Sequence, residues 1–154
     1  MSYKYKVLIM KFISFLHNNE EKFGILNNQS ITDLTGKIYN SNSLKDLILK
    51  NGIAEAKKYA NNNPGNINLD HIEYLPLIPN PGKIICVGLN YSEHVKETNR
   101  TVEENPVIFH RFPESQTAHM QNIQRPIASH SLDFEGEMAV IMGEGGKHIK
   151  PENA

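Results

Sequence analysis

The most informative segment of the chain is KIICVGLNYSEHVKE, which spans residues 83–97. Residues 83–89 form a mostly continuous apolar run, a pattern that is typical of a buried strand. Residues 91–97 then read as a helix or a helical turn, and on a helix His94 and Glu97 would be neighbours on one face. A carboxylate beside a histidine orients the ring and raises its basicity, as a general base requires. For a pair with this spacing alone, a surface turn of mixed charge is the commoner interpretation.

A second segment, DFEGEMAVI at residues 133–141, carries several carboxylates. In a strand alternate side chains share a face, so Glu135 and Glu137 would project together, with Asp133 in phase. Like charges side by side are unfavourable unless a cation holds them, and ligands made only of oxygen favour Mg²⁺, Mn²⁺ or Ca²⁺ over zinc. A solvated strand face is the commoner interpretation of two such acids alone, but the apolar residues 138–142 make the strand resemble a core element.

A third candidate is Arg111, two positions after Phe109 in a strand predicted at residues 106–109. Its guanidinium could clamp a substrate carboxylate through a bidentate contact, and an ordinary surface arginine is the alternative. Residues 143–146 are predicted to form a turn and residues 147–149 a return strand. Three histidines lack the spacing to a cysteine pair that zinc sites show, and we assign them to loops: His110, His119 and His130.

The sequence pattern predicts a small N-terminal subdomain at residues 1–66, which contains a hairpin and helices. Residues 67–154 are predicted to form a second region. Asp46 stands three positions after Ser43, as in a capping box, which marks a helix start. The asparagine-rich residues 61–66 read as the linker between the two parts. The expected elements are strands at 11–16, 22–26 and 30–34, a helix that starts at Ser43 and ends at Gly52, and a second helix at 53–60.

Composition narrows the classes of function. The 154 residues include 16 basic and 17 acidic side chains, for a formal net charge of −1, whereas nucleic-acid-binding proteins normally carry a basic excess. The lone cysteine, Cys86, cannot form an internal disulfide and suits a reducing compartment. The apolar run at residues 7–10 is interrupted by Lys11 and is too short to span a bilayer. We therefore predict a cytoplasmic protein that binds neither nucleic acid nor membrane.

Taken together, the two segments resemble the signatures of the fumarylacetoacetate hydrolase family. Residues 83–97 are similar to its first signature, and LDFEGEMAVIMG at residues 132–143 is similar to its second. Residues 10–60 resemble the family's small N-terminal subdomain. The resemblance implies a mixed α/β, mainly β fold, in which the family's β-roll follows a small α+β subdomain. The family's third acidic ligand would come after Ala154, so we expect residues 67–154 to be a truncated catalytic domain with an incomplete roll.

By this resemblance Glu135 and Glu137 would be ligands of Mg²⁺ or Mn²⁺, and His94 with Glu97 would activate water. Arg111 stands where many relatives carry lysine and would bind the substrate. The implied reaction is hydrolysis of a C–C bond in an acylpyruvate or another 2,4-dioxo acid, and the expected assembly is a homodimer. The family also includes isomerases, decarboxylases and lyases that act on 2-oxo acids at the same site, which is the alternative. A further alternative is a catalytically inactive remnant that needs a second polypeptide.

Overall fold

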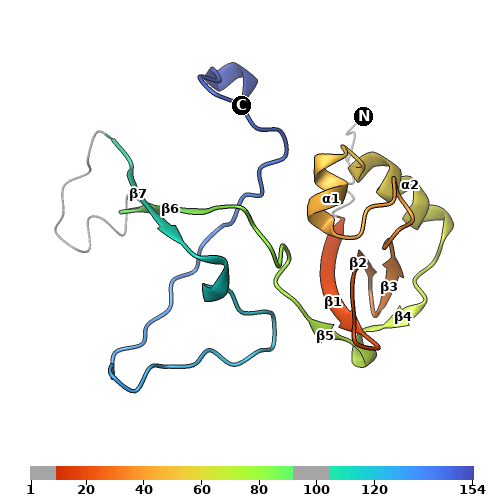
Figure 1. Cartoon of the computed structure of the whole chain (residues 1–154), viewed down its shortest axis with the longest axis horizontal. Helices are drawn as coiled ribbons and strands as arrows, with labels where there is room; N and C mark the ends of the chain where they lie inside the picture. The colour runs from red at the N-terminus through yellow and green to blue at the C-terminus, as the bar shows by residue number, and fades with distance from the viewer. Residues whose placement is uncertain (1–9, 92–104) are drawn as a thin grey trace, which may run out of the picture.

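A computed structural model describes residues 10–91 and 105–154 of the chain (Figure 1). The larger sheet has the strand order β4-β3-β2-β1-β5, and β6 and β7 form a second sheet; all neighbouring strands are antiparallel. The strands are β1 (Lys11–His17), β2 (Glu20–Asn27), β3 (Ser30–Asp33), β4 (Ile67–Asn68), β5 (Glu73–Tyr74), β6 (Ile84–Gly88) and β7 (Val107–Arg111). The helices are α1 (Leu44–Leu49) and α2 (Ile53–Asn62), with 3-10 segments at Leu69–His71, Pro113–Ser115 and Pro151–Asn153.

The hairpin of β1 and β2 is closed by Asn18 and Asn19, whose φ angles are 53° and 62°. Two consecutive residues with positive φ form a two-residue turn whose twist matches the strands that it joins, and asparagine adopts this conformation more readily than most residues. The resulting register pairs His17 with Glu20. The predicted hairpin is confirmed, and so is the third strand, which forms β3.

One face of the larger sheet is covered by α1 and α2. Phe23 and Ile25 of β2 are buried there together with Leu47 of α1. Helix α1 begins where the sequence predicts it, because the Ser43 Oγ accepts a hydrogen bond from the Asp46 N–H at 3.1 Å. This bond satisfies one of the donors that a helix start leaves without a partner. The second predicted helix is confirmed as α2, which ends slightly later than expected.

The opposite face of this sheet is covered by the chain that follows α2. Ile13, Phe15 and Ile31 are buried against Ile67 of β4, and half-buried residues through Tyr74 of β5 pack on them. Both β4 and β5 are strands of this sheet. The folded N-terminal subdomain therefore continues past the boundary that the sequence placed at residue 66.

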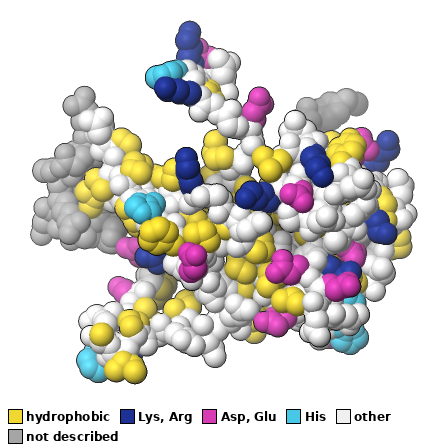
Figure 2. Space-filling model, in the orientation of Figure 1, with side chains coloured by type: hydrophobic (Ala, Val, Ile, Leu, Met, Phe, Trp, Pro, Cys, Tyr) yellow, Lys and Arg dark blue, Asp and Glu magenta, His cyan; other side chains and the backbone are white. Residues whose placement is uncertain are grey.

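Strands β6 and β7 lie where the sequence predicts strands, and they pair so that Cys86 is opposite Phe109. The expected burial of β6 is wrong, since Ile85 is 62% exposed. A two-stranded sheet shields little of its own surface, and no other strand of the described residues joins this one. Its apolar side chains are therefore among the exposed large hydrophobic residues, and Figure 2 shows hydrophobic side chains at several places on the surface of the molecule.

The strand predicted at residues 133–142 is absent from the described structure. These residues have no regular secondary structure, and Phe134 is 90% exposed. An alternating pattern becomes a strand only when a neighbouring strand shares its backbone hydrogen bonds, and no described strand does so here. The return strand expected at residues 147–149 is missing for the same reason. A short 3-10 segment, Pro151–Asn153, follows at the end of the described chain.

The predicted fold class, mixed α/β and mainly β, is confirmed. Of the expected β-roll, the described residues form the β6–β7 pair, and the small α+β subdomain precedes it (Figure 1). Within residues 10–91 and 105–154, no helix is long and apolar enough to cross a membrane.

Candidate functional site

Arg111 is the last residue of β7 and pairs with Ile84 of β6. Directly paired residues share a face of a sheet, so Arg111 lies on the same face as Phe109 and Cys86. The Arg111 side chain is exposed, and its guanidinium forms no ion pair with the described residues. A guanidinium placed in this way beside an apolar surface can bind a planar carboxylate through two parallel hydrogen bonds. The structure leaves Arg111 available for the role predicted from the sequence.

His110 lies within β7 and not in a loop, so the sequence assignment of this histidine is wrong. The predicted strand ended at Phe109, two residues too early. His110 pairs with Ile85 on the face opposite to Arg111, and its ring meets the Phe112 ring edge-on at a centroid distance of 5.4 Å. A histidine on the opposite face cannot complete a catalytic pair with the Arg111 guanidinium.

Glu135 and Glu137 lie on an irregular segment, not on a strand face, and both are exposed. Around Gly136, which separates them, nothing lies within 4 Å of the position that a Cβ would take. The Asp133 Oδ1 accepts a hydrogen bond from the N–H of Phe134 at 2.8 Å, so this carboxylate is engaged by the neighbouring backbone. The prediction that the three acids share one face of a strand is therefore wrong for the described structure.

The carboxylate oxygens of Glu135 and Glu137 are donors that Mg²⁺, Mn²⁺ and Ca²⁺ prefer. The described residues, however, include no group of three or more His, Cys, Asp or Glu side chains that could hold a metal ion. The oxygen chemistry of the two side chains suits a cation, and the described residues bring no third ligating side chain to them. The predicted dyad of His94 and Glu97 lies outside the described residues.

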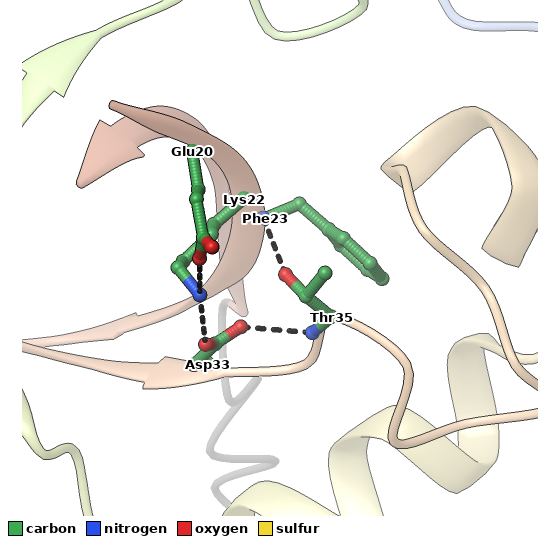
Figure 3. Close-up of polar contacts among 5 residues, drawn as sticks. All are labelled: Glu20, Lys22, Phe23, Asp33 and Thr35. Atoms are coloured by element: carbon green, nitrogen blue, oxygen red, sulfur yellow. Dashed lines mark hydrogen bonds and ion pairs between the residues drawn. The ribbon is translucent and has the colours of Figure 1, made fainter. Parts of the chain in front are cut away.

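A separate ionic cluster joins β2 to β3 (Figure 3). The Lys22 Nζ lies 3.0 Å from the Glu20 Oε2 and 3.6 Å from the Asp33 Oδ2. The hydrogen bond to Glu20 raises the pKa of Lys22, and the charge of Asp33 adds to this against the opposing effect of partial burial. The Asp33 Oδ1 also accepts a hydrogen bond from the Thr35 N–H at 2.8 Å. These groups satisfy one another within the sheet, so we assign the cluster a structural role.

Three other features add no catalytic group. A shallow hollow of about 520 Å³ lies beside Met10 and the helices, and its lining holds a single charge among the described residues, that of Lys57. Cys86 is half-buried, less than predicted, and forms no disulfide. His119 and His130 lie in irregular segments, as predicted. None of these features supplies an acid and a base at short range.

Comparison with known proteins gives a family match on the second part of the chain. Residues 83–154 match the family model described as "Fumarylacetoacetate (FAA) hydrolase C-terminal". An oxaloacetate tautomerase of Rattus norvegicus, named Fahd2a, mitochondrial, is 44% identical over 79 residues, which are 51% of this chain and 25% of the relative. An oxaloacetate tautomerase of Xenopus laevis, named fahd2, mitochondrial, is 36% identical over 105 residues, which are 68% of this chain and 33% of the relative.

A longer alignment joins the chain to a fumarylacetoacetate hydrolase domain-containing protein 2 homolog of Dictyostelium discoideum. This relative is 28% identical over 154 residues, and the alignment covers 95% of this chain and 50% of the relative. The chain thus spans a quarter to a half of the length of these three relatives. Among solved structures, a fumarylacetoacetate hydrolase of Exiguobacterium antarcticum matches with a TM-score of 0.45 and 24% identity, over 70% of this chain and 37% of that protein.

Proposed function

The chain belongs to the fumarylacetoacetate hydrolase family through residues 83–154, and we propose that it supplies part of an isomerase that interconverts the keto and enol forms of a 2-oxo acid. The names of the relatives carry this proposal, because the rat and frog proteins are both called oxaloacetate tautomerases. They favour the isomerase alternative over the C–C hydrolase that the sequence signatures implied first. The substrate class, a 2-oxo acid, is common to both reactions.

Keto–enol exchange requires one proton to leave the carbon beside the carbonyl and one proton to reach the carbonyl oxygen. A base must take the first proton, and donors must stabilise the negative charge that develops on the oxygen. We assign the base to His94, oriented by Glu97, because a carboxylate three residues away on a helix can hold the ring in one tautomer. These two roles rest on the sequence pattern alone.

Arg111 is proposed to bind a carboxylate of the substrate. A carboxylate and a guanidinium form two parallel hydrogen bonds in one plane, which fixes the orientation of the bound acid as well as its position. Phe109, on the same face of β7, would shield these hydrogen bonds from water on one side. A charge-assisted hydrogen bond gains strength when water is excluded from it.

Glu135 and Glu137 are proposed as ligands of Mg²⁺ or Mn²⁺, with Ca²⁺ as the third candidate. The test is calorimetric titration of each ion into the purified chain and into a Glu135→Ala/Glu137→Ala double variant. The expected result is saturable binding that the double variant loses. Binding that survives the double substitution, or no binding by a chain shown to be folded, would contradict this assignment for the chain as it stands.

The reaction itself is tested with two assays on the same preparation. The first follows the loss of the ultraviolet absorbance of enol-oxaloacetate, and the second follows the release of pyruvate from an acylpyruvate by chromatography. We expect faster loss of the enol than in buffer, no cleavage, and loss of activity in His94→Ala. His148→Asn, at an exposed histidine, is the matched control. Cleavage of the acylpyruvate would instead support the hydrolase.

A second candidate is a catalytically inactive remnant that acts only with another polypeptide. The observation that favours it is the apolar surface of β6 and β7, where Ile85, Ile108 and Phe109 are all exposed. A second polypeptide that adds strands to this sheet would bury these side chains. The candidate predicts no activity in either assay for the purified chain, and activity after coexpression with the rest of a family domain.

The expected homodimer and the expected cytoplasmic location remain predictions.

A further inference from the structure

Strand β5 is a short edge strand of the larger sheet. It pairs with β1 through Phe15 with Tyr74 and Leu16 with Glu73, and no described strand pairs with its other edge. Such an edge leaves backbone groups without strand partners, which proteins usually cover or pair. What lies against β5 therefore bears on how the sheet is protected.

The turn at residues 117–121 lies against this edge. The Gln121 Nε2 donates to the Tyr74 carbonyl oxygen at 3.4 Å and to the Glu73 Oε1 at 3.3 Å. The His119 ring meets the Tyr74 ring edge-on, with a centroid distance of 4.8 Å and an interplanar angle of 86°. The turn thus satisfies a carbonyl of the edge strand and packs on its aromatic side chain.

The same glutamine also holds the turn in shape. The Gln121 Oε1 accepts hydrogen bonds from the Ala118 N–H at 3.0 Å and from the Thr117 Oγ1 at 3.4 Å. One side chain therefore closes the turn with its carbonyl oxygen and reaches β5 with its amide nitrogen. Loss of this side chain would break both sets of bonds, and the turn would keep the hydrogen bond from the Gln121 N–H to the Ala118 carbonyl oxygen at 3.2 Å.

Ala118 shows that this turn is an attachment point. It is 6% exposed, and it is the one buried residue among the described residues 105–154. The rest of that stretch, with Glu135 and Glu137, is exposed or half-buried. A single small buried side chain and a few exposed hydrogen bonds hold a segment only weakly, which is the character of a region that opens locally while the core stays folded.

We propose that residues 117–121 form a latch, which covers the edge of β5 and fixes the chain that leads to Glu135 and Glu137 against the N-terminal subdomain. When the latch opens, the Tyr74 carbonyl is exposed and residues 122–142 lose their attachment. The proposal stands on these contacts and is independent of the reaction that the protein catalyses.

The test places a negative charge at position 121, where the Gln121 amide lies beside the Glu73 carboxylate. Gln121→Glu removes the amide donor and puts a carboxylate beside the Glu73 carboxylate, so the latch should open. The double variant Glu73→Gln/Gln121→Glu restores a donor opposite an acceptor between these two side chains, with the partners exchanged. It leaves the Tyr74 carbonyl without its donor, so it should close the latch only in part. Gln124→Glu adds the same charge three positions along an exposed stretch and is the matched control.

Hydrogen–deuterium exchange read by mass spectrometry gives the result for each peptide. In Gln121→Glu we expect exchange in residues 117–122 to rise roughly tenfold, as for the loss of one or two hydrogen bonds, with β1 and β2 unchanged. Exchange in the double variant should lie between that of Gln121→Glu and the original rate, and Gln124→Glu should keep the original rate. Unchanged exchange in Gln121→Glu would overturn the latch. Equal loss of protection in β1 and β2 would also overturn it, because the turn would then be part of the core.

Discussion

Lys22 on β2 and Asp33 on β3 form an ion pair with 3.6 Å between Nζ and Oδ2, and each side chain is only 19% exposed. The residue directly opposite Asp33 is Gly24, so Lys22 reaches it along the diagonal that long side chains can span in an antiparallel pair. Glu20, next to Lys22 on the same face of β2, completes the cluster (Figure 3). The three charges tie the β1–β2 hairpin to the third strand.

The stability of the subdomain should fall at high pH because of this cluster. In the folded protein the pKa of Lys22 is raised, and the hydrogen bond to Glu20 is the largest cause. A raised pKa stabilises the fold below the unfolded value of about 10.4, and the gain disappears as the pH rises through the folded pKa. Urea unfolding measured at pH 8 and again above pH 10.4 should show that the free energy of unfolding is lower at the higher pH by about 0.5 kcal/mol. Lys22→Met should abolish this difference. Lys37→Gln, at an exposed lysine, should retain that loss; if it does not, the loss arises elsewhere.

Gly24→Ala should destabilise the larger sheet. A Cβ at this position would lie 2.3 Å from the Thr32 carbonyl oxygen and 2.7 Å from the Ile31 Cγ2. Backbone cannot move aside as a flexible side chain can, so β2 and β3 would have to separate, at a cost of about 1–3 kcal/mol. Gly136→Ala, which meets nothing within 4 Å, should change the free energy of unfolding little. Equal values for the two variants in urea titrations would count against the tight contact.

Leu47 and Leu49 of α1 offer a matched pair for the helix-covered core. Leu47 is fully buried and Leu49 is 66% exposed. Leu47→Ala should lower the free energy of unfolding by about 2–5 kcal/mol, because it removes a buried side chain and leaves a cavity. Leu49→Ala should stay within about 0.5 kcal/mol of the parent chain. Thermal and urea unfolding of both variants check this, and similar losses would mean that α1 packs differently.

The sequence predicts those elements whose signals are local. Asn18 and Asn19 mark a turn that needs positive φ, and Ser43 with Asp46 marks a helix start; both signals act within a few residues. The pairing of Tyr74 with Phe15 depends on residues far apart in the chain, and no periodicity reports it. For that reason the hairpin and helices were predicted, whereas the place of β4 and β5 in the same sheet was not.

The candidate site follows the same rule. A local apolar run predicts a strand at residues 106–109, just before Arg111, and this strand is present and continues to Arg111. The strand that should carry Glu135 and Glu137 was predicted from alternation, which shows that a segment can serve as a strand but not that a neighbour pairs with it. The latch residue Gln121 gave no signal, because its partners on β5 are distant in sequence.

Arg111 provides the sharpest test of the proposed substrate class. If its guanidinium binds a substrate carboxylate through two hydrogen bonds, Arg111→Lys should keep the charge but lose the planar geometry. Arg111→Gln should lose both, with an expected fall in affinity for oxaloacetate of roughly ten- to a hundredfold. Lys147→Gln removes an equivalent charge at another exposed position and should leave the affinity unchanged. Calorimetric titration of oxaloacetate measures binding apart from catalysis. A ranking in which lysine binds as well as arginine would point to a simple charge effect, and unchanged binding in all three variants would remove Arg111 from the site.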